Sequence, residues 1–304
     1  MFTLKNSPRQ DGKIAVVTGA NSGLGKETAK ALAAKGSHVI IASRSKNKGD
    51  AAKADILKEI PSASIQVKVL DLGSLKNITE FSNEVKSEHK TLDFLINNAG
   101  LMAMPEGKTE DGFETQFGVN HLGHWALTGN LMPILKAAEK ARIVTVTSSA
   151  HHLVARVNFN DPHMRKKYSA WTAYSQSKLA NYYFALGLHK YFQQRKSPIM
   201  SLLAHPGFSK TNLQIETVKQ GGAGFVGKLS EDLVWKIGMT PEVGALPQIR
   251  AALDPKAKSG EFYAPRYFVT GAPVIRPFLR PLASRSITKL WELSERETGV
   301  SISL

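Results

Sequence analysis

The sequence predicts an α/β fold, a doubly wound parallel sheet with helices on both faces, in a single domain over residues 1–304. Three observations predict it. Short and almost continuously apolar runs alternate with helical patterns through most of the chain, and a glycine-rich turn follows the first run. The spacing of the runs also suits right-handed strand–helix–strand units, whose strands are apolar throughout because helices cover both of their faces.

Six apolar runs are the candidate strands, at residues 13–18, 38–43, 65–70, 92–96, 142–147 and 199–204. Helical patterns between and after them predict helices at 24–35, from the second strand to residue 59, and at 74–89, 111–140 and 170–195. After Pro206 the pattern loosens, although Pro241 opens another helix and residues 262–263 indicate a last strand. Ligands of open α/β sheets bind beyond the strand ends, so we expect the irregular segment at about 208–240 to be a substrate lid.

Composition excludes several classes of protein. The 304 residues are 42% hydrophobic, which is enough for a sizeable core and excludes disorder as the main state. The chain has no cysteine, and therefore no disulfide framework, thiolate nucleophile or cysteine-ligated metal. An uninterrupted apolar run of about 18 residues is absent, and the polar N-terminus lacks the apolar core of a signal peptide. We therefore expect a cytoplasmic protein.

Positive charge is in excess, with 40 Lys and Arg against 25 Asp and Glu, a formal charge of +15. No zinc-finger spacing, basic zipper or RNA-binding aromatic motif accompanies it, so we expect no nucleic-acid partner. A basic C-terminal extension, at about 255–304, is predicted to be a solvated surface; the alternative is a weak contact with an anionic membrane surface. Between residues 255 and 290, one acid, Glu261, stands against seven basic residues: Lys256, Lys258, Arg266, Arg276, Arg280, Arg285 and Lys289.

A glycine loop directly follows the first predicted strand, in the sequence TGANSGLG at residues 18–25. Gly19 permits the tight strand-to-helix turn, Gly23 lets the backbone approach a pyrophosphate, and Gly25 allows the helix to pack closely on the strand. The phosphates would then meet the N-terminus of the helix that begins near Leu24. The spacing differs from GxGxxG, but the place between strand and helix favours nucleotide binding.

Cofactor choice is predicted at the end of the second strand. An NAD site has an Asp or Glu there to bind the ribose hydroxyls, whereas this chain has Arg44 and no acid. A guanidinium makes charge-assisted bonds to a 2′-phosphate, and Lys46 or Lys48 would add positive charge. The loop and Arg44 together favour NADP(H) over a merely solvated arginine.

Tyr174 and Lys178 lie four residues apart and therefore share a helix face. The pKa of a free tyrosine is about 10, and a nearby ammonium lowers that pKa by stabilising the phenolate. Such a pair usually serves only to pack the helix. It indicates catalysis when other polar groups lie where a substrate could take up the tyrosine proton. Here Ser148 and Ser149 end the fifth strand, the sequence NNAG at 97–100 ends the fourth, and Asn120 lies within a long helix.

Over about residues 13–215 the chain resembles the short-chain dehydrogenase/reductase family, whose fold is of the Rossmann type. The motifs above occur in the same order along the chain as in that family. Within that family it is most similar to the retinol-dehydrogenase-like branch. The features of the branch are ASRSKNKG after the second strand, NHLGH from Asn120, TSSAHH after the fifth strand, LWELSERETG near the C-terminus, and an insertion at 151–170.

The resemblance implies a catalytic set of four residues. Tyr174 would be the general acid in carbonyl reduction and the base in alcohol oxidation, and Lys178 would lower its pKa and hold the nicotinamide ribose. Ser149, chosen over Ser148 because the family motif ends on the second serine, would bond the substrate oxygen. Asn120 would hold a water in a proton relay through Lys178.

The resemblance also implies an NADP(H) site and no metal. The glycine loop would hold the pyrophosphate, Arg44 the 2′-phosphate, and the residues after the third, fourth and sixth strands the adenine, ribose and nicotinamide. The implied cofactor-binding residues are Gly19, Asn21, Ser22, Gly23, Leu24, Gly25, Arg44, Asp71, Leu72, Asn98, Ala99, Gly100, Tyr174, Lys178, Pro206, Gly207 and Thr211.

The predicted function is an NADP(H)-dependent oxidoreductase, or carbonyl reductase, that interconverts an alcohol and a carbonyl on a small or lipophilic substrate. The family's habit of pairing long helices predicts a homodimer or homotetramer. One alternative is a relative of protochlorophyllide reductase, which the absence of cysteine disfavours. A non-catalytic NADP-binding regulatory protein is another, and the intact set of Asn120, Ser149, Tyr174 and Lys178 weighs against it. Retinal-reducing members often have an N-terminal membrane anchor that this sequence does not show.

Overall fold

The computed structural model describes residues 2–209, 238–277 and 283–304. Most of the expected substrate lid at 208–240, and Thr211 within it, therefore lies outside the described residues. At the centre of the described chain is an eight-stranded sheet in the order β3-β2-β1-β4-β5-β6-β7-β8, parallel except for β8. The strands are β1 Ile14–Thr18, β2 His38–Ser43, β3 Ile65–Val69, β4 Phe94–Asn97, β5 Arg142–Val146, β6 Met200–Ala204, β7 Phe262–Pro265 and β8 Pro273–Arg276.

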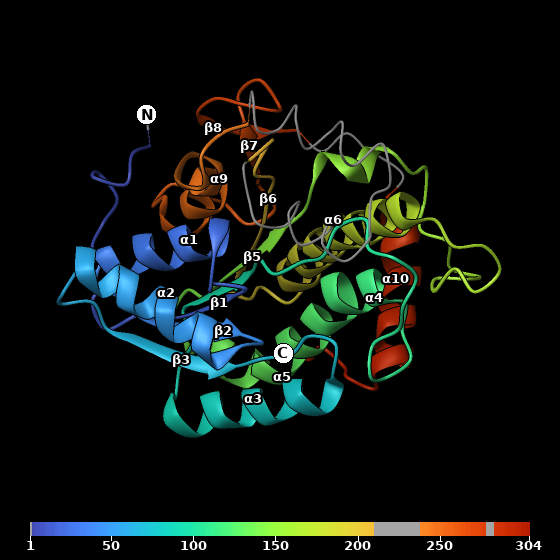
Figure 1. Ribbon diagram of the computed structural model, residues 1–304, viewed down its shortest axis with the longest axis horizontal. Helices are drawn as coiled ribbons and strands as arrows, with labels where there is room; N and C mark the ends of the chain where they lie inside the picture. Colours follow the sequence, from blue (N-terminus) through green and yellow to red (C-terminus); the bar gives the residue numbers. More distant parts are fainter. Residues whose placement is uncertain (1, 210–237, 278–282) are drawn as a thin grey trace.

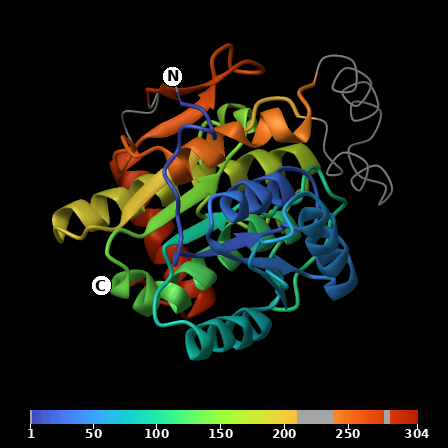
Figure 2. The ribbon, with the colours of Figure 1, turned by 90° about the vertical axis from the view of Figure 1, so that its left-hand side faces the viewer.

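Helices cover the sheet in two layers (Figures 1 and 2). One layer contains α1 Gly23–Ala34, α2 Lys46–Glu59 and α9 Pro241–Leu253. The other contains α3 Leu75–Glu88, α5 Gly123–Ala137 and α6 Ala170–Gln194, and α10 Ala283–Thr298 packs on α6. The single doubly wound α/β domain that the sequence predicts is confirmed.

The apolar runs became strands because both faces of the sheet are buried. In β1, Val16 faces the layer of α3 and α5, while Ala15 and Val17 face that of α1 and α9, and all three side chains are fully buried. β1 pairs with β2 on one side and with β4 on the other. The chain therefore changes direction across the sheet beside β1, where doubly wound folds bind their ligands.

The helix predicted at 111–140 begins and ends inside those bounds, and it is interrupted. The Glu114 carboxylate accepts hydrogen bonds from the Gln116 and Phe117 backbone amides at 2.8 and 2.6 Å, so the helix starts after it, with α4 Thr115–Phe117. A π-helical turn, η1 Gly118–Leu122, follows before α5 begins. Such π-turns are rare and are often found at functional sites, and this one carries Asn120.

The segment at about 255–304, which the sequence predicts to be a basic extension, supplies β7, β8 and α10 to the domain. The α10 helix is held by aromatic packing, because the Trp291 ring meets the Trp125 ring edge-on at a centroid distance of 4.6 Å. Gly187 lets the Trp291 ring also pack directly on the α6 backbone, since a Cβ there would lie 2.9 Å from that ring. No helix in the described ranges is both long and apolar enough to cross a bilayer.

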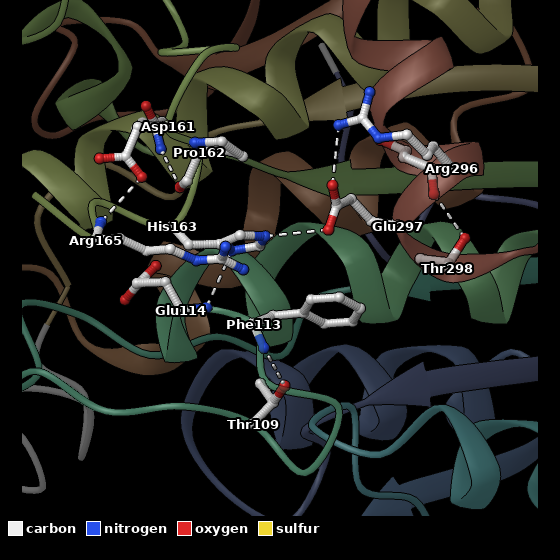
Figure 3. A network of polar contacts seen from close by, with 12 residues as sticks. Thr109, Phe113, Glu114, Asp161, Pro162, His163, Arg165, Arg296, Glu297 and Thr298 are labelled. Atoms are coloured by element: carbon white, nitrogen blue, oxygen red, sulfur yellow. Dashed lines mark hydrogen bonds and ion pairs between the residues drawn. The ribbon is translucent and has the colours of Figure 1, made fainter.

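The insertion at 151–170 is anchored between α4 and α10 (Figure 3). His163, nearly buried, accepts a hydrogen bond at Nδ1 from the Glu114 backbone amide, at 3.1 Å. Its Nε2 lies 3.2 Å from the Glu297 carboxylate of α10, which Arg296 also contacts at 2.9 Å. The insertion therefore begins at the carboxyl edge of the sheet, at η2 Ser149–His152, and is fixed by the C-terminal helix.

Candidate active site

The loops after β1 and β4 meet at the carboxyl edge of the sheet. Gly19 has φ +66°, which favours glycine, and a Cβ there would lie 3.0 Å from the Ala99 Cα. The Asn98 side-chain amide donates to the Thr18 carbonyl at 2.8 Å, and Gln248 of α9 donates to the Asn98 carbonyl oxygen at 3.1 Å. The Asn98 side chain thus fixes the loop, which leaves the backbone of 98–100 to line the crevice.

The N-terminus of α1 is built to receive an anion. Its N-cap, Ser22, makes no side-chain hydrogen bond to the first turn, so the cap leaves the N–H groups of the first turn to another acceptor. Gly23 has φ +53°, and a Cβ on Gly25 would lie 2.4 Å from the Gly19 carbonyl oxygen. A cradle that only glycines can form fits a pyrophosphate, with Asn21 and Leu24 half-buried in the same turn.

At the end of β2, the Arg44 side chain is exposed and makes no hydrogen bond or ion pair with the described residues. Lys46, by contrast, pairs with Asp50 at 2.9 Å, one turn along α2. At the end of β3, the Asp71 carboxylate accepts from the Gly73 amide at 2.8 Å, and Leu72 is buried beneath α5. Arg44 is therefore a cation available to an anionic ligand at this edge.

Tyr174 and Lys178 lie one turn apart on α6, both almost completely buried. Burial raises the pKa of Tyr174 to about 12, an effect that Ser148 partly offsets. The lowering of this pKa by Lys178 that the sequence predicts is therefore not found: burial outweighs it. Burial lowers the pKa of Lys178 to about 8. The Lys178 Nζ lies 3.4 Å from the Val146 carbonyl oxygen. A Cβ on Gly100 would lie 3.2 Å from the same Nζ. The amine is thus held between the ends of β4 and β5.

The two serines after β5 have different surroundings. Ser148 lies near enough to the Tyr174 hydroxyl to lower its pKa, and the Ser148 Oγ accepts from the Ala150 amide at 3.3 Å. Ser149, the residue selected from the sequence, is half-buried and opens η2. The structure therefore brings Ser148 to the tyrosine, a contact that the sequence does not indicate.

Asn120 holds the loop after β4 with its side chain. Its Oδ1 accepts from the Leu101 amide at 2.7 Å, and its Nδ2 donates to the Leu101 carbonyl at 2.9 Å and to the Ser177 hydroxyl at 2.8 Å. Both polar atoms of this side chain therefore have protein partners. The side chain that is expected to hold a relay water is thus engaged by the Leu101 backbone and the Ser177 hydroxyl.

The segment after β6 is placed by the β7–β8 hairpin. Gly207 has φ +69°, and a Cβ there would lie 2.5 Å from the Val269 carbonyl oxygen. The Phe208 amide donates to that same oxygen at 2.9 Å. Pro206 and Gly207 thus lie at the carboxyl edge with the other predicted residues, while Thr211 lies outside the described residues.

Residues 13–221 match the short chain dehydrogenase family, and the chain belongs to that family. It lies in the retinol-dehydrogenase-like branch: human retinol dehydrogenase 13 is 40% identical over 243 residues, which are 80% of this chain and 72% of that protein. Mouse polyprenol dehydrogenase is 38% identical over 254 residues, 82% of this chain and 74% of its own. A solved structure from Mycobacterium paratuberculosis, 36% identical, superposes with a TM-score of 0.80 and covers 100% of this chain and 99% of its own. The family consists of oxidoreductases that use nicotinamide cofactors.

Proposed function

We propose that this protein is an NADP(H)-dependent dehydrogenase that interconverts a lipophilic, isoprenoid-like alcohol and its carbonyl. The observation that carries the proposal is the buried Tyr174–Lys178 pair beside the serine pair, on the edge where the glycine loop opens. Retinol dehydrogenase 13 and polyprenol dehydrogenase are named for isoprenoid alcohols, which supports the substrate class.

When bound, the nicotinamide cofactor supplies the hydride in carbonyl reduction and accepts it in alcohol oxidation, and the protein correspondingly supplies or takes up the proton. Tyr174, with its pKa near 12, is a neutral phenol at pH 7, the form that donates a proton to a carbonyl oxygen during reduction. In alcohol oxidation the phenolate is needed, and the Lys178 ammonium stabilises it. With a pKa of about 8, Lys178 is mostly protonated at pH 7 and can return a proton to the tyrosine.

The remaining catalytic residues orient the substrate oxygen and the groups around it. Ser149 donates a hydrogen bond to that oxygen, and Ser148 orients the Tyr174 hydroxyl beside it. Asn120 keeps Leu101, and so the preceding Gly100, against the Lys178 amine.

The preference for NADP(H) rests on Arg44. Its guanidinium is exposed and makes no ion pair within the described chain, and no acid follows it between residues 44 and 46, where an NAD site would have one. A ribose 2′-phosphate would supply the missing anionic partner. Lys48 is exposed nearby, whereas Asp50 engages Lys46.

The test is reduction by the purified protein with NADPH, followed by the loss of nicotinamide absorbance. We expect kcat/KM for retinal and farnesal to exceed that for hexanal by at least about tenfold, since several additional apolar carbons are buried in the substrate site. Equal values for the three aldehydes would refute the isoprenoid class. NADPH binding without turnover of any aldehyde would favour the non-catalytic regulatory alternative.

A further inference from the structure

A second histidine of the NHLGH motif, His124, lies at the start of α5 and takes no part in the chemistry proposed above. Its side chain is fully buried. The ring Nδ1 lies 2.9 Å from the Asn120 backbone carbonyl oxygen, and the ring Nε2 lies 2.9 Å from the Thr18 hydroxyl oxygen. A buried imidazole with a partner on each nitrogen has a defined tautomer.

The partners determine where the proton sits. A carbonyl oxygen only accepts, so Nδ1 carries the hydrogen and donates it to Asn120. Burial lowers the pKa of His124 to about 4, and the positive charge of Lys178 acts in the same direction, so the ring is neutral at pH 7. Nε2 therefore accepts. The single hydrogen of the Thr18 hydroxyl has two acceptors within reach, His124 Nε2 at 2.9 Å and the Ile96 carbonyl oxygen at 3.2 Å, and the ring nitrogen is the nearer one.

The Thr18 oxygen extends this chain of hydrogen bonds to the loop after β4. It accepts from the backbone amides of Asn98 and Ala99, both at 2.9 Å. One imidazole thus connects three segments: the end of β1 at the glycine loop, the loop after β4, and the π-turn of Asn120. The bond from His124 Nδ1 to the Asn120 carbonyl and the two bonds from the backbone amides to Thr18 have fixed directions, and loss of the imidazole would leave the Asn120 carbonyl without this donor.

These three segments set the position of the amine that the proposed reaction uses. A Cβ on Gly100 would lie 3.2 Å from both the Lys178 Nζ and the Asn120 Oδ1, so the loop and the π-turn enclose that amine closely. A displacement of the π-turn relative to Thr18 would therefore shift Leu101 and Gly100, which Asn120 holds, relative to the Lys178 amine on α6.

We propose that His124 is a positioning residue, which holds the π-turn of Asn120 at a fixed distance from the glycine loop and the loop after β4. The proposal rests on the proposed function, because these loops are the ones assigned to the nicotinamide cofactor. It predicts that His124 acts on cofactor affinity and on kcat through the backbone, without touching the substrate.

Two substitutions at His124 separate the polar bonds from packing. His124→Phe keeps a planar ring and removes both hydrogen bonds. His124→Asn places an amide nitrogen near the position of Nδ1, and so can keep the bond to Asn120 while it loses the bond to Thr18. The control is His121→Phe, in the same motif, since His121 is equally buried but its Nε2 bonds the Ser294 hydroxyl of α10, at 2.8 Å.

The measurements are the NADPH dissociation constant, from the change in nucleotide fluorescence on binding, kcat with retinal, and the thermal unfolding midpoint. We expect His124→Phe to weaken NADPH binding by about tenfold, the effect of about one buried hydrogen bond, and to lower kcat as well. His124→Asn should recover part of both losses. His121→Phe should lower the unfolding midpoint but leave the dissociation constant within about twofold.

Unchanged NADPH affinity in a folded His124→Phe protein would overturn the proposal, and so would equal weakening by His121→Phe. If His124→Phe does not fold, His124→Asn decides alone: a dissociation constant equal to that of the wild type refutes the role, and one raised by about threefold or more supports it. A wild-type protein that binds neither NADPH nor NADH would instead refute the proposed function, which distinguishes the two failures.

Discussion

The Lys178 Nζ lies 5.9 Å from the centroid of the Tyr174 ring, one turn along α6, with both side chains buried. Burial favours the neutral form of each group, since it raises the pKa of the tyrosine to about 12 and lowers that of the lysine to about 8. A carbonyl that reaches this pair therefore meets a protonated phenol, next to an amine that is charged at neutral pH.

The first prediction concerns the proton. Tyr174→Phe should lower kcat for aldehyde reduction by at least about a thousandfold, because only the transferable proton is lost. NADPH affinity should stay within about threefold, since the ring and its packing remain. Steady-state kinetics and a binding titration check both values. Activity within tenfold of the wild type would remove Tyr174 from this role.

The second prediction concerns pH. Above about pH 8 the Lys178 ammonium is lost, so kcat/KM for reduction should fall by about tenfold per pH unit beyond that value. Below it the charged form dominates, and the profile should be flat down to about pH 6. In Lys178→Met the step near pH 8 should disappear and NADPH should bind more weakly. A wild-type profile that stays level up to pH 10 would contradict the assignment.

The third prediction distinguishes the two serines. Ser149→Ala should lower kcat by about a hundredfold, because the hydroxyl bonds the oxygen on which charge develops. Ser148→Ala should lower it by about tenfold or less, since it removes the contact with the Tyr174 hydroxyl and the bond from the Ala150 amide but no bond to the substrate oxygen. The comparison is kcat with a single aldehyde at saturating NADPH. The reverse order of the two losses would assign the substrate contact to Ser148.

Much of the fold follows from the sequence because buried parallel strands are apolar along their whole length. The run at 38–43 became β2 His38–Ser43, and that at 65–70 became β3 Ile65–Val69. The start of the helix at Thr115 was missed, because it depends on Glu114, a residue that seldom caps helices and here does so with a buried carboxylate. Hydrophobic periodicity carries no information on such a cap.

Other features depend on contacts between distant segments and have no local signal. β8 Pro273–Arg276 is a four-residue, mostly half-exposed strand that begins with a proline, and it exists through its antiparallel pairing with β7. The sequence likewise placed Thr18 and His124 within motifs, but a bond between side chains 106 positions apart becomes visible only in the folded chain.

The fourth prediction concerns the cofactor. The wild type should prefer NADPH to NADH by at least about tenfold in kcat/KM, the effect of one charge-assisted bond to the 2′-phosphate. Arg44→Asp should reverse or erase that preference, since a carboxylate repels phosphate. Lys46→Ala is the control, and it should change the ratio by less than about threefold because Asp50 already engages Lys46. A wild-type ratio of one or less would refute the NADP(H) assignment.

The last prediction concerns the anchor between the insertion and α10 (Figure 3). Burial alone would raise the pKa of Glu297, but its bonds to Arg296 and His163 outweigh burial and lower that pKa below the usual value of 4.5. A carboxyl whose pKa is lower in the folded chain than in the unfolded chain stabilises the fold above the unfolded pKa, and that stabilisation is lost as the pH falls through the folded pKa.

Glu297→Gln should therefore lower the thermal unfolding midpoint at pH 7 by about 2–4 °C. The difference from the wild type should shrink as the pH falls below about 4.5. The control is Glu292→Gln, which alters an exposed carboxylate on the same helix and should shift the midpoint by less than about 1 °C at either pH. An equal loss in both variants, or a loss that does not change with pH, would show that the Glu297 carboxylate does not fix the insertion to α10.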